Sequence, residues 1–206
     1  MGLKERRQKE KNQRKKQILE AARSILYESG LQAASITRIA SLAELGVGTI
    51  YSYYQSKEEI FIALQQQGLE LLCAKLRTID DTAAAPVEKL KQYAMAYLDF
   101  SQNNREYYDI INYFLASPEV MFSRPLKDRI DRKGNNILQV VAGTIEAGIQ
   151  AGIFVDVDAV RYAMILWATL QGMLQLRKMK NTLLKGEDYE DLYEASVKNF
   201  IKGLYL

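Results

Sequence analysis

Apolar side chains recur three and four residues apart along most of the chain, which is the spacing of helices with one buried face. The first such stripe contains Ile18, Ala21, Ala22, Ile25 and Leu26. It ends before Gly30, a residue that commonly stops a helix. Two short apolar groups then predict helices at residues 36–43 and 47–53, with a turn at residues 44–46 between them. Helices this short are stable only when they pack against the first helix and each other.

A capping box predicts the start of a longer helix. Ser56 and Glu59 have the S-x-x-E spacing, in which Ser56 accepts a hydrogen bond from the Glu59 amide and the Glu59 carboxylate accepts one from the Ser56 amide. Asp156 and Asp188 are predicted to cap the last two of five further helices, at residues 86–103, 105–116, 126–152, 157–180 and 188–203. Every predicted element is a helix, so the predicted fold class is all-α.

The composition excludes most catalytic chemistry. The 206 residues include no histidine and one cysteine, Cys73. These counts exclude Ser-His and Cys-His nucleophile systems, the usual zinc and haem ligand sets and an internal disulfide. We therefore expect no enzyme activity, no metal and no other cofactor. The scarcity of cysteine and the lack of an apolar segment after the basic N-terminus predict a cytoplasmic location, and the longest apolar run, residues 163–170, is too short for a membrane span.

Positive charge is concentrated at the N-terminus. Residues 1–16 contain eight Lys or Arg and two Glu, whereas the rest of the chain carries a net charge of −3. This asymmetry predicts a basic arm with a polyanionic partner, and the other interpretation is a solvated tail. The cations lie near the start of the first helix, where the helix dipole disfavours them by roughly a few tenths of a kcal/mol each. A sequence that accepts this cost indicates a gain outside the helix, such as contact with phosphates.

The two short helices have the spacing of a helix-turn-helix. Ala40 lies where the helices would cross, Ile50 where the second would insert against the first, and the second helix could enter a DNA major groove about 12 Å wide. The segment 35–61 resembles the DNA-binding signature of the tetracycline-repressor (TetR) family of bacterial transcription regulators. The shared letters are IA at 39–40, A at 43, GTIY at 48–51, YY at 53–54 and SKEE at 56–59. The rest of the chain agrees with the family in length, helical character and helix order.

The resemblance implies two domains and a set of DNA contacts. Residues 1–57 would form the DNA-binding domain with its basic arm. Residues 58–206 would form a helical domain for effector binding and dimerisation, with the transition running along the long helix near Gly68. Phosphate contacts are expected from Thr49, Tyr53 and Lys57. The other expected DNA-binding positions, in the groove or at its edge, are Thr37, Arg38, Val47, Gly48 and Tyr51.

Three residues of the signature need a separate account. Glu44 stands where the family usually has a turn glycine, and a left-handed conformation there would cost about 1 kcal/mol. Gly46 replaces a common capping serine and is an acceptable N-cap. Tyr54 occupies the family's phenylalanine position, so we expect it in the core.

Two apolar seams run along the helix predicted at residues 157–180. A helix that is apolar on more than one face is buried from more than one direction, so one face predicts a second subunit. The resemblance implies that this helix and the last one form an intersubunit four-helix bundle. The other interpretation is a core helix within a monomer. The predicted interface residues are Val160, Met164, Trp167, Gln171, Leu174, Tyr193, Val197 and Phe200.

Seven of the chain's twenty aromatic residues lie between residues 93 and 114. A bare cluster of this kind is more often core than binding site. In the TetR family, however, the corresponding helices enclose the effector pocket, and apolar walls with scattered hydroxyls would suit a flat or lipophilic molecule. The candidate effector residues are Tyr93, Tyr97, Phe100, Tyr108, Ile111, Phe114, Val141, Ile145, Leu166 and Met173.

These observations predict a ligand-responsive, homodimeric DNA-binding regulator. The regulator is expected to be a repressor, which a small apolar or aromatic effector releases from a palindromic operator. Its partners would be double-stranded DNA, the effector and a second copy of itself, and no membrane. The alternative is a helical protein-interaction module whose basic tail binds acidic partners without sequence-specific DNA binding.

Overall fold

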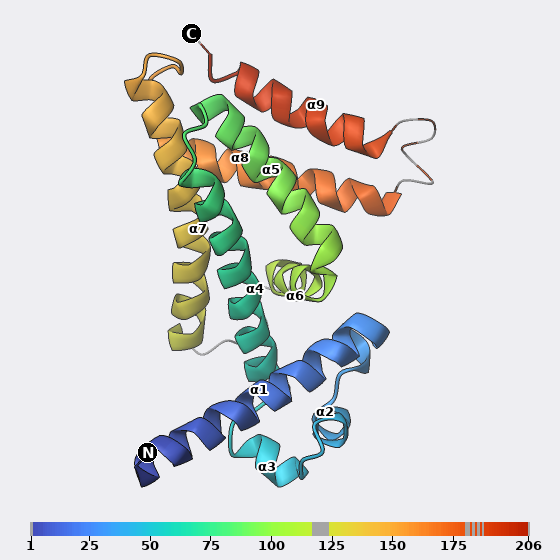
Figure 1. Ribbon diagram of the computed structural model, residues 1–206. Helices are drawn as coiled ribbons and strands as arrows, with labels where there is room; N and C mark the ends of the chain where they lie inside the picture. The colour runs from blue at the N-terminus through green and yellow to red at the C-terminus, as the bar shows by residue number, and fades with distance from the viewer. Residues whose placement is uncertain are drawn as a thin grey trace. The chain divides into compact units, whose positions relative to one another are not determined.

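The computed structural model describes residues 2–116, 124–179, 182, 184, 186 and 188–205. Most of these residues lie in α-helices, so the predicted all-α fold is confirmed (Figure 1). No helix in this part of the chain is both long and apolar enough to cross a membrane. The α-helices are α1 Leu3–Ser29, α2 Ile36–Leu42, α3 Val47–Tyr51, α4 Lys57–Asp80, α5 Pro86–Asn103, α6 Arg105–Ala116, α7 Arg124–Gln150, α8 Ala159–Leu176 and α9 Tyr189–Lys202.

The chain divides into two compact units, and α4 and α7 contribute to both. Unit 1 consists of residues 1–68 and 104–130, and unit 2 of residues 69–103 and 131–206. Unit 1 therefore contains α1, α2, α3 and α6, and unit 2 contains α5, α8 and α9. Compactness does not report which residues touch DNA, so the functional boundary after residue 57 stays a prediction.

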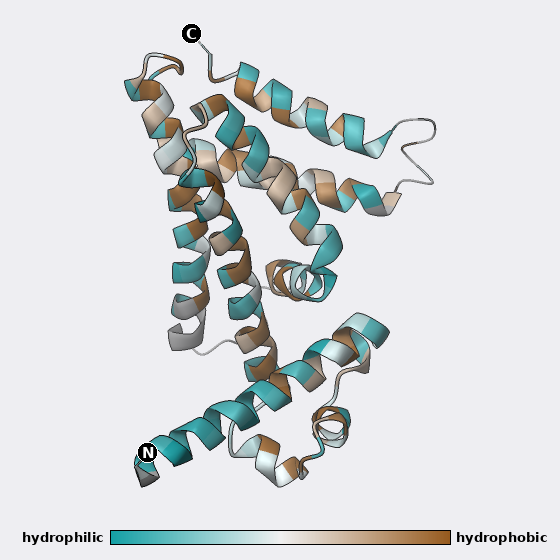
Figure 2. Cartoon of the chain, viewed as in Figure 1, coloured by the Kyte–Doolittle hydropathy of each residue, from teal (hydrophilic) through white to brown (hydrophobic). Residues whose placement is uncertain are grey.

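The apolar stripe of α1 forms the core of unit 1. Ile18 and Ala22 are fully buried, and α1 packs against α2 and α6. Ile39 of α2, Ile50 of α3 and Ile60 of α4 are also fully buried. Figure 2 shows hydrophobic residues in the second half of α1 and hydrophilic ones in the first half. The stripe predicted from the sequence is therefore part of the surface that holds α2, and α3 packs in turn against α2.

The first half of α1 differs from the expected arm because it is helical from Leu3 onward. The Gly2 amide donates a hydrogen bond to the Glu5 carboxylate at 2.9 Å, which caps the helix start. Arg6 lies 3.5 Å from Glu10, one turn along. Such pairs three and four residues apart favour a helix even where no apolar side chain is buried.

Several helix ends differ from those predicted. α7 spans Arg124–Gln150 rather than residues 126–152, and α8 ends at Leu176 rather than at residue 180. α3 ends at Tyr51 rather than at residue 53. Asp158 rather than Asp156 caps α8, and its carboxylate accepts a hydrogen bond from the Arg161 amide at 3.0 Å. Asp158 caps the helix because it directly precedes the first helical residue, where its short side chain reaches the free amide.

Unit 2 packs α5 against α8 and α9. Tyr193 of α9 is fully buried, and its hydroxyl donates to the Ala94 carbonyl of α5 at 2.8 Å. The Tyr93 hydroxyl donates to the Asp80 carboxylate at 3.1 Å and lies 2.9 Å from the Thr144 hydroxyl. This polar group joins the end of α4 to α5 and α7.

Candidate nucleic-acid interface

The segment from α2 to α3 is held by backbone and capping hydrogen bonds. Ser35 caps α2, its hydroxyl accepting from the Arg38 amide at 3.2 Å. After α2 the chain turns at Glu44, whose φ of 54° lies in the left-handed region. The Leu45 amide donates to the Ala40 carbonyl at 2.9 Å and closes the turn. Residue 44 therefore has the conformation that a glycine adopts most easily.

One buried side chain fixes α3 and leaves the rest of the helix accessible. Ile50 is fully buried, and the amides of Thr49 and Ile50 donate to the Gly46 carbonyl at 2.9 and 3.2 Å. Val47 is 40% exposed and Tyr51 is 52% exposed. The outward face of α3 thus carries an apolar group and a phenol on a rigid support, as a helix that enters a groove requires.

The start of α4 provides a cation beside free backbone amides. Ser56 accepts from the Glu59 amide at 3.4 Å, as predicted. The predicted donor to the Glu59 carboxylate was the Ser56 amide. The carboxylate instead accepts a hydrogen bond at 2.7 Å from the amide of Gln55, the residue before Ser56, because the glutamate side chain is long enough to reach past the cap. Lys57 Nζ lies 5.6 Å from the centre of the Phe61 ring. An ammonium group held at a helix N-terminus is a suitable ligand for phosphate.

The exposed end of α2 adds one residue that the sequence analysis missed. Thr37 and Arg38 are exposed in the first turn of α2, and Arg38 Nη2 donates to the Ser29 hydroxyl at 2.9 Å, which ties the guanidinium to the end of α1. Leu42 is 51% exposed at the other end of α2. The sequence could have indicated Leu42 as an accessible residue, because it lies outside the buried apolar stripe of α2.

Tyr54 belongs to the core, whereas its neighbours in the sequence are more accessible. It is buried, as predicted, and desolvation together with the nearby Glu59 charge raises the pKa of its phenol to about 12. Thr49 and Tyr53 are only half-buried. Gly48 is exposed, and a Cβ atom built on it would have no neighbour within 4 Å. The protein itself therefore does not require glycine here, and the open space would admit a nucleic-acid backbone.

The eight expected DNA-binding residues lie at the start of α2, on α3, in the turn after α3 and at the start of α4. None of the eight is buried. Their hydroxyls, guanidinium and ammonium groups can bind phosphates, while the exposed apolar groups can contact base edges.

Comparison with known families decides the family. Residues 18–64 match the model of the bacterial regulatory proteins of the tetR family, and residues 90–200 match the model of the tetracyclin repressor-like C-terminal domain. The chain belongs to the TetR family. The TetR family consists of transcriptional regulators rather than enzymes, so membership supports the regulator interpretation and not the protein-interaction module.

Relatives of this TetR chain are named as regulators. The transcriptional repressor KstR2 of Mycobacterium tuberculosis is 28% identical over 152 residues, which cover 72% of this chain and 74% of KstR2. The uncharacterized regulator YhgD of Bacillus subtilis is 27% identical over 195 residues, which cover 93% of this chain and 96% of YhgD. The structure of Bacillus subtilis FadR in complex with stearoyl-CoA has a TM-score of 0.71 at 20% identity, over 92% of this chain and 98% of that one. The likeness to FadR shows a shared fold.

The predicted dimer residues of this TetR chain divide by burial. Those exposed on α8 are Val160, Met164 and Trp167. Those buried within the protomer are Leu174, Tyr193 and Val197. Phe200 and Gln171 are half-buried, and Gln171 accepts a hydrogen bond from the Tyr97 hydroxyl at 2.6 Å. The buried three pack inside their own subunit. Ile165 of α8 is also 42% exposed, on another side of the helix.

The ten predicted effector residues lie in the interior of both units. Tyr108, Ile111 and Phe114 belong to unit 1, and the other seven belong to unit 2. All ten are buried except Met173, which is half-buried. Core and pocket side chains are both buried, so the effector assignment stays a prediction. Among the described residues, no group of three or more Cys, Asp or Glu could hold a metal ion.

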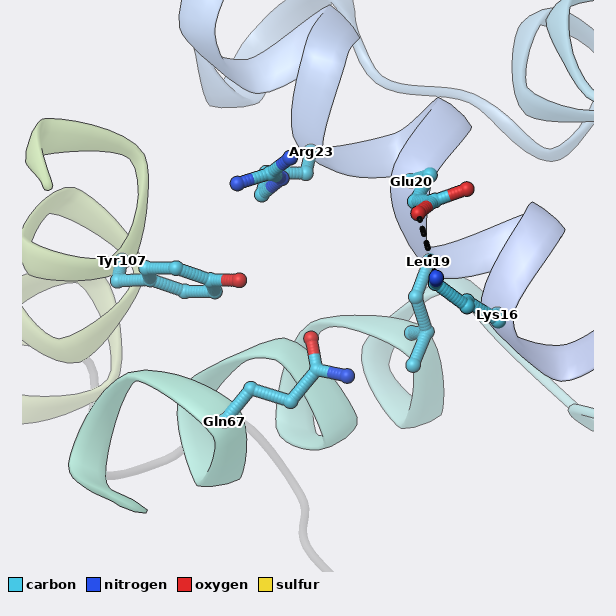
Figure 3. Close-up of a pocket in the computed structure, with 6 residues that line it drawn as sticks. All are labelled: Lys16, Leu19, Glu20, Arg23, Gln67 and Tyr107. Carbon is cyan, nitrogen blue, oxygen red and sulfur yellow. Dashed lines mark ion pairs between the residues drawn. The ribbon is translucent and has the colours of Figure 1, made fainter. Parts of the chain in front are cut away.

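Unit 1 also contains a polar pocket that the sequence did not predict. Figure 3 shows this pocket, of about 220 Å³, with the side chain of Arg23 extending toward Tyr107. Arg23 lies 3.7 Å from Glu106, a nearly buried carboxylate on α6. Burial is the main reason why the pKa of Tyr107 is raised. The pocket is lined by Lys16, Leu19, Glu20, Arg23, Gln67 and Tyr107.

Proposed function

We propose that this chain is a cytoplasmic, homodimeric repressor that binds a palindromic DNA operator and is released from it by a small apolar or aromatic effector. The observation that carries the DNA-binding role is the construction of α3. Ile50 is buried, while Val47 and Tyr51 of the same helix are exposed. A helix supported in this way can enter a major groove without giving up core contacts.

Two copies of α3, related by a twofold axis, would read the operator. Dimers of this type place their reading helices about 34–36 Å apart, so that the helices enter successive major grooves on one face of the duplex. The operator would then be a pseudo-palindrome with one half-site for each subunit.

The contacts within each half-site follow from the chemistry of the interface. Thr49, Tyr53 and Lys57 hold the phosphate backbone and so fix the depth and register of α3. Val47 and Tyr51 meet base edges, where the apolar side chain suits a thymine methyl group. Leu42 extends this apolar contact, and Thr37, Arg38 and Gly48 lie at the edge of the groove.

The phosphate contact of Lys57 can be measured on a duplex that the wild-type protein has selected from a random-sequence library. Each lost phosphate contact lowers the slope of log K against log salt by about 0.9. We expect this reduction, per protomer, for Lys57→Ala. Lys75→Ala is the control, because this lysine of unit 2 pairs with Asp99 at 2.6 Å. An unchanged slope in Lys57→Ala would exclude the phosphate role.

The dimer would form through the exposed face of α8. Val160, Met164, Ile165 and Trp167 leave apolar surface in solvent in the protomer, and such surface on a helix is typical of a subunit interface. Tyr193 and Val197 are left out of the proposed contact because they are buried within one subunit. On α9 the half-buried Phe200 stays in the proposal.

The effector would be lipophilic. The predicted effector residues combine aromatic rings with aliphatic side chains, and such walls favour apolar molecules. The names of two relatives support this class: KstR2 is described as a ketosteroid regulator, and FadR was solved with stearoyl-CoA. Release from DNA requires that the effector bind the DNA-free conformation more tightly than the DNA-bound one.

Stearoyl-CoA and a ketosteroid are therefore the probes for the effector. We expect one of them to raise the melting temperature of the free protein and to lower its operator affinity. By linkage, the operator must then lower the affinity for that probe by the same factor. A lipophilic effector is contradicted if neither probe changes the melting temperature or the operator affinity.

A further inference from the structure

The first half of α1 carries cations on the same helical face as the core. Residues 4–16 include no apolar side chain. Five cations nevertheless continue the three-and-four spacing that leads to the buried Ile18 and Ala22. This basic stripe consists of Lys4, Arg7, Lys11, Arg14 and Lys15.

The two acidic residues of this segment lie off the basic stripe. Glu5 accepts a hydrogen bond from the Gly2 amide, and Glu10 lies 3.5 Å from Arg6 on another face. Lys16, also off the stripe, lies 3.6 Å from Glu20. Within the part of the chain that the structure describes, no member of the stripe forms an ion pair. The stripe is therefore the least neutralised side of the helix.

The basic stripe ends beside the turn that follows α3. Lys15 Nζ lies 5.8 Å from the centre of the Tyr54 ring, in the turn between α3 and α4. The four stripe residues before Lys15 are exposed, so no part of unit 1 covers them. Figure 2 shows this half of α1 as hydrophilic throughout. The last member of the stripe therefore lies beside the segment that joins α3 to α4.

We propose that the basic stripe is a rigid binding surface for the phosphate backbone beside the half-site, a role that rests on the proposed DNA-binding function. Lys4 and Lys15 are eleven residues apart, which is about 16 Å along a helix. The five cations divide this length into four intervals of about 4 Å on average, and one DNA strand carries a phosphate every 3.4 Å of axis. The charge density of the stripe is thus close to that of a single strand.

A membrane surface fits the stripe less well than DNA does. Helices that lie on membranes need an apolar face as well as cations. Residues 4–16 offer no such face, since the side opposite the stripe carries Arg6, Lys9 and Lys16. A polyanion without an apolar component is the matching partner.

The stripe also disfavours the free helix. Arg7 and Lys11 are four residues apart, as are Lys11 and Lys15, and repulsion between like charges at this spacing weakens a helix. Phosphates would remove this repulsion on binding. Substitutions in the stripe should therefore weaken DNA binding without lowering the melting temperature, which a merely structural role would not produce.

Two triple variants with equal charge loss test the proposal. The stripe variant is Lys4→Gln, Arg7→Gln and Lys11→Gln, and the matched control is Arg6→Gln, Lys9→Gln and Lys16→Gln. Binding is measured against salt on the selected duplex and on a scrambled duplex of equal length. We expect the stripe variant to lose about 2.7 from the slope per protomer, and the control to lose less than about 0.9.

The outcomes separate this proposal from the proposed function. Equal slopes for the two triple variants, or a slope unchanged from wild type in the stripe variant, overturn the stripe. A wild-type protein that does not prefer the selected duplex overturns the proposed function. In that case the salt slopes of the two variants on the scrambled duplex still test the stripe by itself. Tighter binding of the wild type to anionic vesicles than to either duplex also overturns the stripe.

A proline substitution tests whether the stripe acts as a rigid helix. Gln13 is exposed and lies between the stripe's first three members and the core part of α1. Gln13→Pro interrupts the helix there, and residues after it can stay helical because proline is tolerated in a first turn. We expect Gln13→Pro to reduce the salt slope as the stripe variant does, and Gln13→Ala to leave it unchanged. Wild-type binding by Gln13→Pro would mean a flexible arm and would overturn the rigid surface.

Discussion

Glu44 shows how a single residue can occupy a conformationally costly position. Its φ of 54° lies in the left-handed region, where a side chain is strained. A glycine at this position would avoid about 1 kcal/mol of this strain. Glu44→Gly is therefore expected to raise the free energy of unfolding by up to about 1 kcal/mol in urea denaturation. Glu58→Gly, in the first turn of α4, is expected to lower it by a similar amount. The same sign for both variants would contradict the strain at residue 44.

The hydroxyl of Tyr93 forms hydrogen bonds inside the protein. Tyr93→Phe removes the hydrogen bonds to Asp80 and Thr144, and we expect a loss of about 1 kcal/mol in unfolding free energy at pH 7. Burial raises the pKa of Tyr93 to about 12, above its unfolded value near 10. Its contribution to stability is therefore complete below pH 10 and falls as the pH rises toward 12. Tyr27→Phe, at an exposed tyrosine, should change stability little.

The residue-level predictions succeeded where local spacing decided the outcome. The motif placed Ile50 and Tyr54 in the core and gave Glu44 its turn conformation, because each depends on neighbours within a few residues. The partners of Tyr93 could not be predicted in this way. Asp80 and Thr144 lie on other helices, and periodicity reports only which face of its own helix a residue occupies.

Two glycines of α7 have opposite roles. A Cβ atom on Gly148 would lie 2.1 Å from Cδ2 of Phe154, a buried ring, whereas one on Gly143 would meet no atom within 4 Å. Gly148→Ala is expected to destabilise the protein by roughly 1–3 kcal/mol through overpacking. Gly143→Ala is expected to stabilise it by up to about 1 kcal/mol through helix propensity. Thermal unfolding distinguishes the two, and a loss of stability in both variants would refute this account.

At the scale of elements, helices were easier to predict than their ends. Apolar spacing located each helix because every one of them buries a face. The first half of α1 has no such face, so only its charged pairs, such as Arg6 with Glu10, held the signal for a helix. The ends depend on which side chain reaches a free amide, and Asp156 and Asp158 could not be separated by type alone.

For the whole molecule, the proposed dimer depends on the exposed face of α8. Met164→Glu places a charge in the proposed interface, where it would be buried without a partner. We expect this variant to sediment as a monomer at concentrations where the wild type is a dimer. Met95→Glu, at a similarly exposed methionine of α5, should leave the wild-type state unchanged. A dimer that persists in Met164→Glu would place the interface elsewhere.

The sequence predicted that α8 is apolar on two faces but not which α9 residues lie between subunits. Tyr193 and Val197 are four residues apart, as residues on an interface stripe would be, yet they are buried within the protomer. A stripe on a last helix can face its own subunit or a partner, and only the position of α5 beneath Tyr193 resolves the choice.

The central claim is that two copies of α3 read a twofold-symmetric DNA site. Selection from a random-sequence duplex library, followed by sequencing, tests it most directly. The account predicts an enriched motif of two inverted half-sites with centres about 10 to 10.5 base pairs apart, or a multiple of that spacing. Tyr51→Ala should lose the enrichment while keeping weak, salt-sensitive DNA binding. A library that yields no enriched motif, or a motif without inverted symmetry, would contradict the claim.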